Sequence, residues 1–138
     1  MAKAAGYSGT PLVRKLGLKP GMRTCFVSAP DGYLGDTLEV PPDVRVLARP
    51  GADMDFVQVF VTRRADLDKA LARLEPKLAT AGALWISWPK GKRAADGDLD
   101  GNVVRTMGLA TGLVDVKVCA VDEVWSGLKF VRRRADRT

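Results

Sequence analysis

The feature that most constrains this chain is the stretch "VKVCAVDEVWSGLKFV" at residues 116–131. Two β-prone runs are separated there by only three residues, "DEV". Parallel strands need a crossover of about a dozen residues or more, so these two strands must pair antiparallel. Asp122 and Glu123 then lie at a hairpin turn, where acidic residues are common because their side chains hydrogen-bond to the nearby backbone. The acid pair therefore indicates a turn rather than two catalytic carboxylates.

Upstream of the hairpin, strand-like and helix-like segments alternate. Apolar, β-prone runs predict strands at residues 23–28, 44–48, 55–61 and 83–88, and the hairpin adds two more. Helix-like segments separate most of them, so the first four strands are expected to run parallel. Gly127 lies inside the last strand, where a glycine often marks a bulge or a close approach of backbone. The pattern predicts a layered α/β domain.

The clearest helix follows Thr62, which we expect to be its N-cap. Its apolar residues recur at helical spacing, and Pro76 predicts an end near residues 73–75. A shorter helix in "TPLVRKLG" is expected to start at Thr10 and to end at Gly17. Two further helices are expected, a glycine-broken one capped by Asp31 and one at residues 101–111 with Gly112 as a cap.

Composition excludes several classes of function. The chain has no histidine, so it lacks the commonest general base near neutral pH. Its two cysteines, Cys25 and Cys119, lie in apolar runs and are expected to pack as small hydrophobic residues, which argues against a zinc site. The N-terminus has no hydrophobic stretch, and no run approaches the ~20 apolar residues of a membrane span. We expect a soluble, cytoplasmic protein without a metal.

The charge and the chain ends suggest a simple domain organisation. Residues 1–9 are expected to form a flexible arm, residues 10–131 a single α/β domain and residues 132–138 a basic tail. The net charge is +6, and the tail "RRRADRT" contributes four arginines and one aspartate to it. Such a tail can contact phosphates, but it is more often a frayed, solvated end.

The element order and the closing hairpin resemble the methyltransferase variant of the Rossmann fold. The stretch from "DFVQVFV" to "LARLEPKLATAGALWISWPK" is similar to the fourth strand, the following helix and the fifth strand of those enzymes. The resemblance covers roughly residues 20–131. It implies a Rossmann-like three-layer α/β sandwich, with a mostly parallel sheet that ends in an antiparallel hairpin and a truncated methyltransferase-like topology.

Two positions depart from the cofactor-binding pattern of that family. Its first strand leads into a glycine-rich loop that admits the cofactor to the backbone, whereas this chain reads "VSAPDGY", with Pro30 and a single glycine. An acid usually follows the second strand and holds the ribose, whereas this chain has Arg49 in "VLARPG". No G-x-G-x-x-G occurs either. We therefore expect no cofactor, with S-adenosylmethionine left open as a ligand whose binding motif is missing.

A narrower resemblance rests on three segments that cover most of the chain. "GYSGTPLVRKLGLKPGMR", "WPKGK" and "GLVDVKVCAVDEVWSGLKFVRR" together look like a family of short bacterial proteins, a domain family of unknown function. The last segment is the most distinctive of the three. This resemblance implies no activity.

A ligand site is expected at the carboxyl ends of the parallel strands, where open α/β sheets bind their ligands. The residues that we expect to meet at this rim are Ser28, Asp31, Tyr33, Arg63, Trp88, Lys90, Asp122 and Trp125. Each also has a structural interpretation: Asp31 as a cap, the tryptophans as core and the cations as surface charges. The ring of Tyr33 is expected to fill the space that a coenzyme occupies in the related enzymes. We assign no catalytic residue.

Three functions are compatible with these observations. The first is a non-catalytic methyltransferase-like domain that binds a partner protein or a small ligand such as an anion. The second is a transferase that uses S-adenosylmethionine or a nucleotide in a non-standard mode, with Arg49 meeting a phosphate. The third is weak nucleic-acid binding through the basic tail, which lacks an aromatic platform and ranks last. A homo-oligomer that pairs through an edge strand, either the short second strand or the hairpin, is also open.

Overall fold

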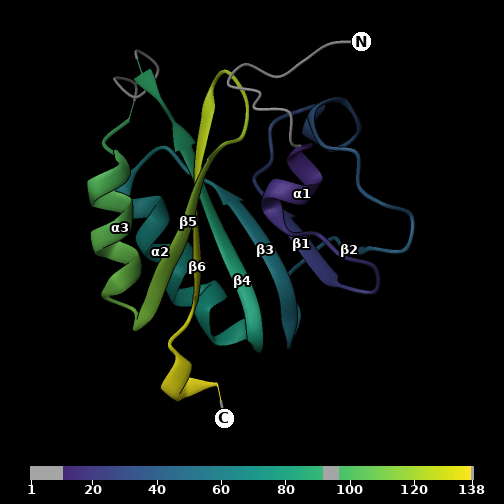
Figure 1. The fold of residues 1–138 in the computed structure, drawn as a ribbon. Helices are drawn as coiled ribbons and strands as arrows, with labels where there is room; N and C mark the ends of the chain where they lie inside the picture. Colours follow the sequence, from purple (N-terminus) through teal and green to yellow (C-terminus); the bar gives the residue numbers. More distant parts are fainter. Residues whose placement is uncertain (1–10, 92–96, 138) are drawn as a thin grey trace.

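The fold is built on a six-stranded sheet with the strand order β2-β1-β3-β4-β6-β5 (Figure 1). The computed structural model describes residues 11–91 and 97–137. The strands are β1 (Arg23–Val27), β2 (Arg45–Leu47), β3 (Met54–Phe60), β4 (Leu78–Pro89), β5 (Leu113–Ala120) and β6 (Trp125–Arg132). β2, β1, β3 and β4 run parallel, and β6 pairs antiparallel with both β4 and β5. The predicted α/β class, parallel half and closing hairpin are confirmed.

Helices cover both faces of the sheet and define two apolar clusters. On one face, α2 (Arg64–Leu74) and α3 (Gly101–Leu109) pack on Val57, Val59 and Leu84. On the other face, α1 (Leu12–Leu16) and the irregular turn Tyr33–Thr37 pack on Phe56, Phe60 and Trp85. Strands with partners on both faces are buried almost throughout, and this explains the continuous apolar runs of β3 and β4.

The apolar stripe of α2 is confirmed, since Leu67, Ala70, Leu71 and Leu74 are all buried. The helix ends where Pro76 predicts, and the 3-10 turn Glu75–Lys77 leads directly into β4. β4 therefore begins at Leu78, earlier than expected, because residues 79–82 ("ATAG") are small and mostly have little β propensity. Gly17 ends α1 with a φ of 81°, as predicted.

Two predicted helix caps are wrong. The residue before α2 is Arg63, not Thr62, and its side chain makes no capping bond; the Asp98 carboxylate instead accepts the Arg64 N–H at 2.6 Å. Asp31 caps nothing, because Gly32 precedes the turn and Leu34 and Gly35 break its helicity. Thr10, the third predicted cap, lies outside the described residues, as does the predicted arm at residues 1–9.

Of the two features expected at Gly127, a bulge or a close approach, the structure has the close approach. The register irregularity of the hairpin lies between Asp115 and Lys117, and Gly127 pairs regularly with Ser87 and Cys119. Gly127 marks a close approach instead, because a Cβ there would lie 3.2 Å from the Trp85 ring. Both cysteines are free and buried, as expected, and they belong to the clusters on opposite faces of the sheet.

The edges and ends of the fold follow from its topology. β2 and β5 form the two edges, and Val46, Val116 and Val118 are exposed on them. The predicted self-pairing through such an edge stays a prediction. Arg132 is the last residue of β6, so the strand continues one residue beyond the expected domain limit. Across residues 11–91 and 97–137, every helix is too short or too polar to cross a membrane.

Candidate functional site

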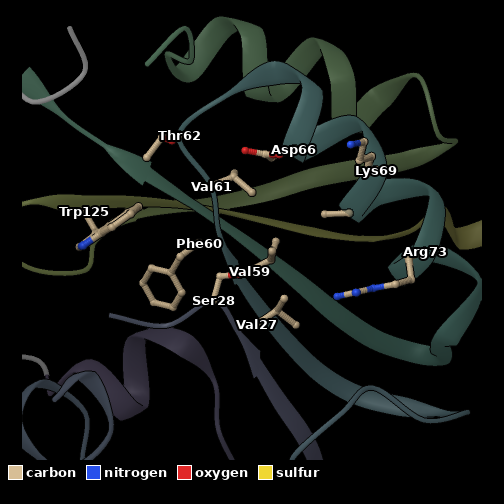
Figure 2. Close-up of a pocket in the computed structure, with 11 residues that line it drawn as sticks. Val27, Ser28, Val59, Phe60, Val61, Thr62, Asp66, Lys69, Arg73 and Trp125 are labelled. Carbon is tan, nitrogen blue, oxygen red and sulfur yellow. The ribbon is translucent and has the colours of Figure 1, made fainter. Parts of the chain in front are cut away.

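A cavity of about 500 Å³ opens between the carboxyl ends of β1 and β3 and the side of α2 that faces them (Figure 2). Val27, Val59, Val61 and Ala70 give it an apolar floor. Its other lining residues are polar or aromatic: Ser28, Phe60, Thr62, Asp66, Lys69, Arg73 and Trp125. The cavity therefore lies at the rim where the strand order of an open α/β sheet predicts a ligand.

Ser28 shapes the edge of this cavity through its backbone. Its φ is 58°, in the left-handed region that residues other than glycine seldom adopt. The strand β1 therefore turns sharply at Ser28 and continues into Ala29 and Pro30. Residues held in such conformations cluster at ligand sites, where the surrounding structure maintains them.

One side of α2 supplies the charged wall of the cavity. Asp66, Lys69 and Arg73 follow each other at intervals of three and four residues, so they share a side of the helix. Figure 2 shows the Arg73 guanidinium directed over the floor toward Val27 and Val59. Among the residues that the structure describes, neither Lys69 nor Arg73 has a hydrogen-bond or ion-pair partner. The wall thus offers two unpaired cations against a single carboxylate.

A second cavity of about 510 Å³ adjoins the first and shares Val27, Ser28 and Arg73 with it. It lies over β1 and the end of β2, and its remaining lining residues are Cys25, Phe26, Ala48, Arg49, Pro50 and Lys77. This part of the sheet is open because residues 48–53, which connect β2 to β3, form no helix that would cover it. We call the two cavities together the α2 groove.

Aromatic rings form the other end of the first cavity. The Phe60 ring lies between Trp125, at 5.1 Å, and Tyr33, at 4.8 Å between centroids, and meets both edge-on. Tyr33 itself is buried and does not line the cavity. Its hydroxyl donates to Gln58 Oε1 at 2.7 Å, and Gln58 Nε2 donates to Ser87 Oγ at 3.0 Å. Burial raises the pKa of Tyr33 above its ordinary value, so the phenol stays neutral and supports the aromatic end from beneath.

The structure brings only two of the predicted rim residues, Ser28 and Trp125, into this cavity. Asp122 holds the hairpin turn, where its Oδ1 accepts the N–H groups of Val124 and Trp125, both at 2.8 Å. The Lys90 N–H donates to the Val124 carbonyl at 2.9 Å. These bonds give the acid a structural role, as the hairpin interpretation predicts.

The remaining three predicted rim residues lie elsewhere. Trp88 belongs to the core beneath α2 and α3 and is 7% exposed, so its placement at an accessible rim is wrong. Trp88 pairs with Ser126, the residue next to Trp125, and successive residues of a strand alternate between the two faces of the sheet. The side chains of Trp88 and Trp125 therefore point to opposite faces. Asp31 and Arg63 are exposed and line neither cavity of the groove.

Sequence reasoning missed the contribution of α2. Lys69 and Arg73 resemble ordinary solvent-facing charges beside the apolar stripe, and only their position against the open end of β1 distinguishes them. The signal that was available is spacing: Asp66, Lys69, Arg73 and Lys77 recur along one side of the segment that follows β3. Sequence reasoning also did not assign Phe60 or Thr62 to the site. Phe60 is the last residue of an apolar strand and Thr62 follows it closely, and the apolar pattern indicates core packing.

The groove does not offer the usual contacts for S-adenosylmethionine. β1 is followed by Ser28, Ala29 and Pro30 where the family pattern has a glycine-rich turn, and Arg49 follows β2 where that pattern has an acid. The sulfonium of that cofactor is a cation, and the unpaired charges of α2 are mostly cations as well. The residues present therefore do not fit the standard binding mode of this group.

Comparison with solved structures supports the assignment of the fold. A SAM-dependent methyltransferase from Aquifex aeolicus matches with a TM-score of 0.61 at 18% identity over 86% of each chain. A TehB-like SAM-dependent methyltransferase from Corynebacterium glutamicum matches with a TM-score of 0.59 at 13% identity, over 94% of this chain and 91% of the other.

A third likeness is to magnesium protoporphyrin IX methyltransferase from Synechocystis PCC 6803, with a TM-score of 0.58 at 15% identity over 88% of this chain and 74% of that one. No family model matches the chain, and no curated protein matches it. At identities this low, the similarity shows the fold alone. The chain has the Rossmann-like fold of SAM-dependent methyltransferases, as its element order predicts.

Proposed function

We propose that this chain is a non-catalytic binding domain on a methyltransferase-like scaffold, and that it holds a small anion in the α2 groove. One observation carries the proposal: the Arg73 guanidinium, without a partner among the described residues, extends over the apolar floor of the first cavity. Arg73 is exposed, so an anion placed there would meet a charge that solvent reaches on one side and the apolar floor borders on the other. A bidentate guanidinium suits carboxylate or phosphate.

The chemistry available at the site favours binding over catalysis. Among the residues that the structure describes, Asp66 is the only carboxylate that lines either cavity, and the chain has no histidine. Acid-base catalysis usually needs a titrating partner near neutral pH, which histidine supplies most often. Ser28 and Thr62 offer hydroxyls, but neither hydroxyl makes a hydrogen bond to a carboxylate or an amine among the described residues. The groove is thus equipped to hold and orient a ligand.

A thermal-shift series tests this proposal. Phosphate, pyrophosphate, citrate, S-adenosylmethionine and S-adenosylhomocysteine are each added to the full chain, since a ligand that binds only the folded state raises the melting temperature by mass action. We expect the multivalent anions to raise it and Arg73→Ala to abolish the rise. Arg134→Ala, which removes an exposed arginine outside both cavities, is the matched control and should retain it. Methyl transfer to any acceptor would refute the non-catalytic assignment.

A second candidate function is a transferase that binds S-adenosylmethionine in a non-standard mode. The observation in its favour is the extent of the structural likeness, since one of the similar methyltransferases was solved with bound SAM and covers most of this chain. The same series separates the two candidates. Under this alternative, S-adenosylmethionine raises the melting temperature more than the anions do, and Arg73→Ala does not weaken its effect.

A further inference from the structure

We infer that the ligand of the α2 groove is a phosphate-bearing nucleotide, with its phosphates on the cations of the groove and its base at the aromatic end. The inference rests on the proposed function, which requires an anion but not a nucleotide. It follows from the types of side chain along the groove, because one end is aromatic and the rest is cationic. Figure 2 shows the Trp125 ring and the Arg73 guanidinium at opposite ends of the first cavity.

The cationic part of the groove matches more than one phosphate. Lys69, Arg73 and Lys77 follow each other at intervals of four residues, so they form a row along α2 and the turn after it. Arg49 faces this row from the end of β2, where it lines the second cavity together with Arg73 and Lys77. Of the described residues, these four cations and one carboxylate, Asp66, are the charged groups that line the groove. A monovalent anion would leave most of this charge uncompensated, whereas a diphosphate would engage it.

The position of Arg73 makes it the central contact. Within the described part of the chain, it is the one charged residue that lines both cavities, so a diphosphate that spans their junction would lie on its guanidinium. The same guanidinium acts on buried Cys25 beneath the second cavity: burial raises the pKa of that thiol, and the positive charge of Arg73 opposes the rise. Two parallel N–H donors of an arginine match two phosphate oxygens better than a lysine does.

The opposite end is suited to a base and a sugar. Trp125 is partly exposed at the cavity, and Phe60 holds it edge-on from below. An aromatic ring with one accessible face is a stacking surface for any base. Ser28 and Thr62 place hydroxyl groups on the strand ends between this ring and the cations. Hydroxyls at that point can hydrogen-bond to a ribose.

The size of the groove agrees with a ligand of this length. Each cavity has about 500 Å³, and the two share Val27, Ser28 and Arg73 in their linings. Pockets for compact organic ligands range over ~300–1,000 Å³, so the groove is large for an inorganic ion and sufficient for a nucleoside diphosphate. Four cations also disfavour a positively charged ligand such as a sulfonium compound.

Isothermal titration calorimetry on the full chain tests the inference with ADP, inorganic pyrophosphate and adenosine as probes. We expect ADP to bind more tightly than either of its two parts. Arg73→Ala should weaken ADP and pyrophosphate alike, by about tenfold or more, because both depend on the same charged contact. Arg73→Lys retains the charge without the planar pair of donors, so its affinity for both ligands should lie between those of wild type and Arg73→Ala. Arg134→Ala should change neither affinity.

Trp125→Leu distinguishes a nucleotide from a simple anion. It retains an apolar contact for Phe60, and circular dichroism verifies that it folds. Stacking on one aromatic ring is worth ~1–3 kcal/mol per base. This variant should therefore lower the affinity for ADP by about tenfold and leave the affinity for pyrophosphate unchanged.

The outcomes separate the failure of this inference from that of the proposed function. If pyrophosphate binds as tightly as ADP, or if Trp125→Leu leaves ADP unaffected, the nucleotide is refuted and the anion site stands. If adenosine or S-adenosylmethionine binds and pyrophosphate does not, both proposals fail.

Discussion

Tyr33 shows how one buried polar group constrains the end of the core next to the groove. Its hydroxyl donates to Gln58, which donates in turn to Ser87, and all three residues are at most 2% exposed. Tyr33→Phe removes the donor and leaves Gln58 Oε1 buried without a partner. We expect a loss of about 1–3 kcal/mol in the free energy of unfolding, measured by urea denaturation.

A double-mutant cycle is the control for this prediction. Gln58→Met removes the acceptor, so the loss in the Tyr33→Phe, Gln58→Met double variant should be smaller than the sum of the two single losses. Strictly additive losses would show that the two side chains are not coupled.

The pH dependence of the stability of wild type and Tyr33→Phe tests the burial of Tyr33 independently. Burial raises the pKa of Tyr33, so the folded state holds the phenol neutral while the unfolded chain ionises it near pH ~10. The contribution of Tyr33 to stability is therefore complete below about pH 10 and decreases as the pH rises above it. The stability difference between wild type and Tyr33→Phe should shrink over that alkaline range. A constant difference would contradict the assigned burial.

At the scale of elements, α2 depends on a residue far away in the sequence. Asp98 accepts the Arg64 N–H at the first turn of the helix, from a position 34 residues later. Its negative charge also interacts favourably with the amino end of the helix. We expect Asp98→Ala to lower the free energy of unfolding by about 1 kcal/mol and Asp98→Asn, which keeps an acceptor, by less. Urea denaturation measures both.

The matched control for that substitution is Asp68→Ala. Asp68 is an exposed acid on the same helix with no hydrogen bond or ion pair among the described residues. Its removal should change stability by no more than about 0.5 kcal/mol. Equal losses in Asp68→Ala and Asp98→Ala would show that the net charge of the helix, and not the capping bond, is responsible.

The cap of α2 also illustrates what the sequence could predict. Local periodicity located the apolar stripe of α2, the core strands and the hairpin, because those signals lie within one segment. Thr62 was the best local candidate for the cap, but the bond comes from Asp98 through tertiary contact. The site follows the same division: Ser28 and Trp125 lie at predicted strand ends, whereas Lys69 and Arg73 gain their role only from the position of α2 against β1.

At the scale of the whole molecule, the groove is a consequence of the short connection between β2 and β3. Residues 48–53 pass from β2 to β3 without a helix. Within residues 11–91 and 97–137, no helix covers β1 and β2 on the side of α2, and the apolar side chains of Val27 and Leu47 are only partly buried there. The cations of α2 border this open area, so the short connection and the charged groove belong together.

Arg132, at the end of β6, connects the hairpin to the start of β4 through its side chain. Its guanidinium forms an ion pair with Glu75 and donates to the carbonyls of Glu75 and Leu78, each at 2.8 Å. These contacts connect the antiparallel hairpin to the turn that leads from α2 into β4. We expect Arg132→Ala to lower the free energy of unfolding by about 1–3 kcal/mol in urea, since it leaves two carbonyls and a partly buried carboxylate without their donor.

A truncated chain that ends at Arg132 is the comparison that locates the limit of the domain. Residues 133–137 are exposed, and their ion pair between Arg133 and Asp136 is at the surface, where such pairs contribute little. Truncation should therefore cost far less than Arg132→Ala, although it removes more positive charge. Arg132→Lys should not restore stability, because an ammonium cannot reach Glu75 and both carbonyls with one planar fork. If truncation and Arg132→Ala proved equally destabilising, residues 133–137 would contribute to the stability of the domain, and the domain would not end at Arg132.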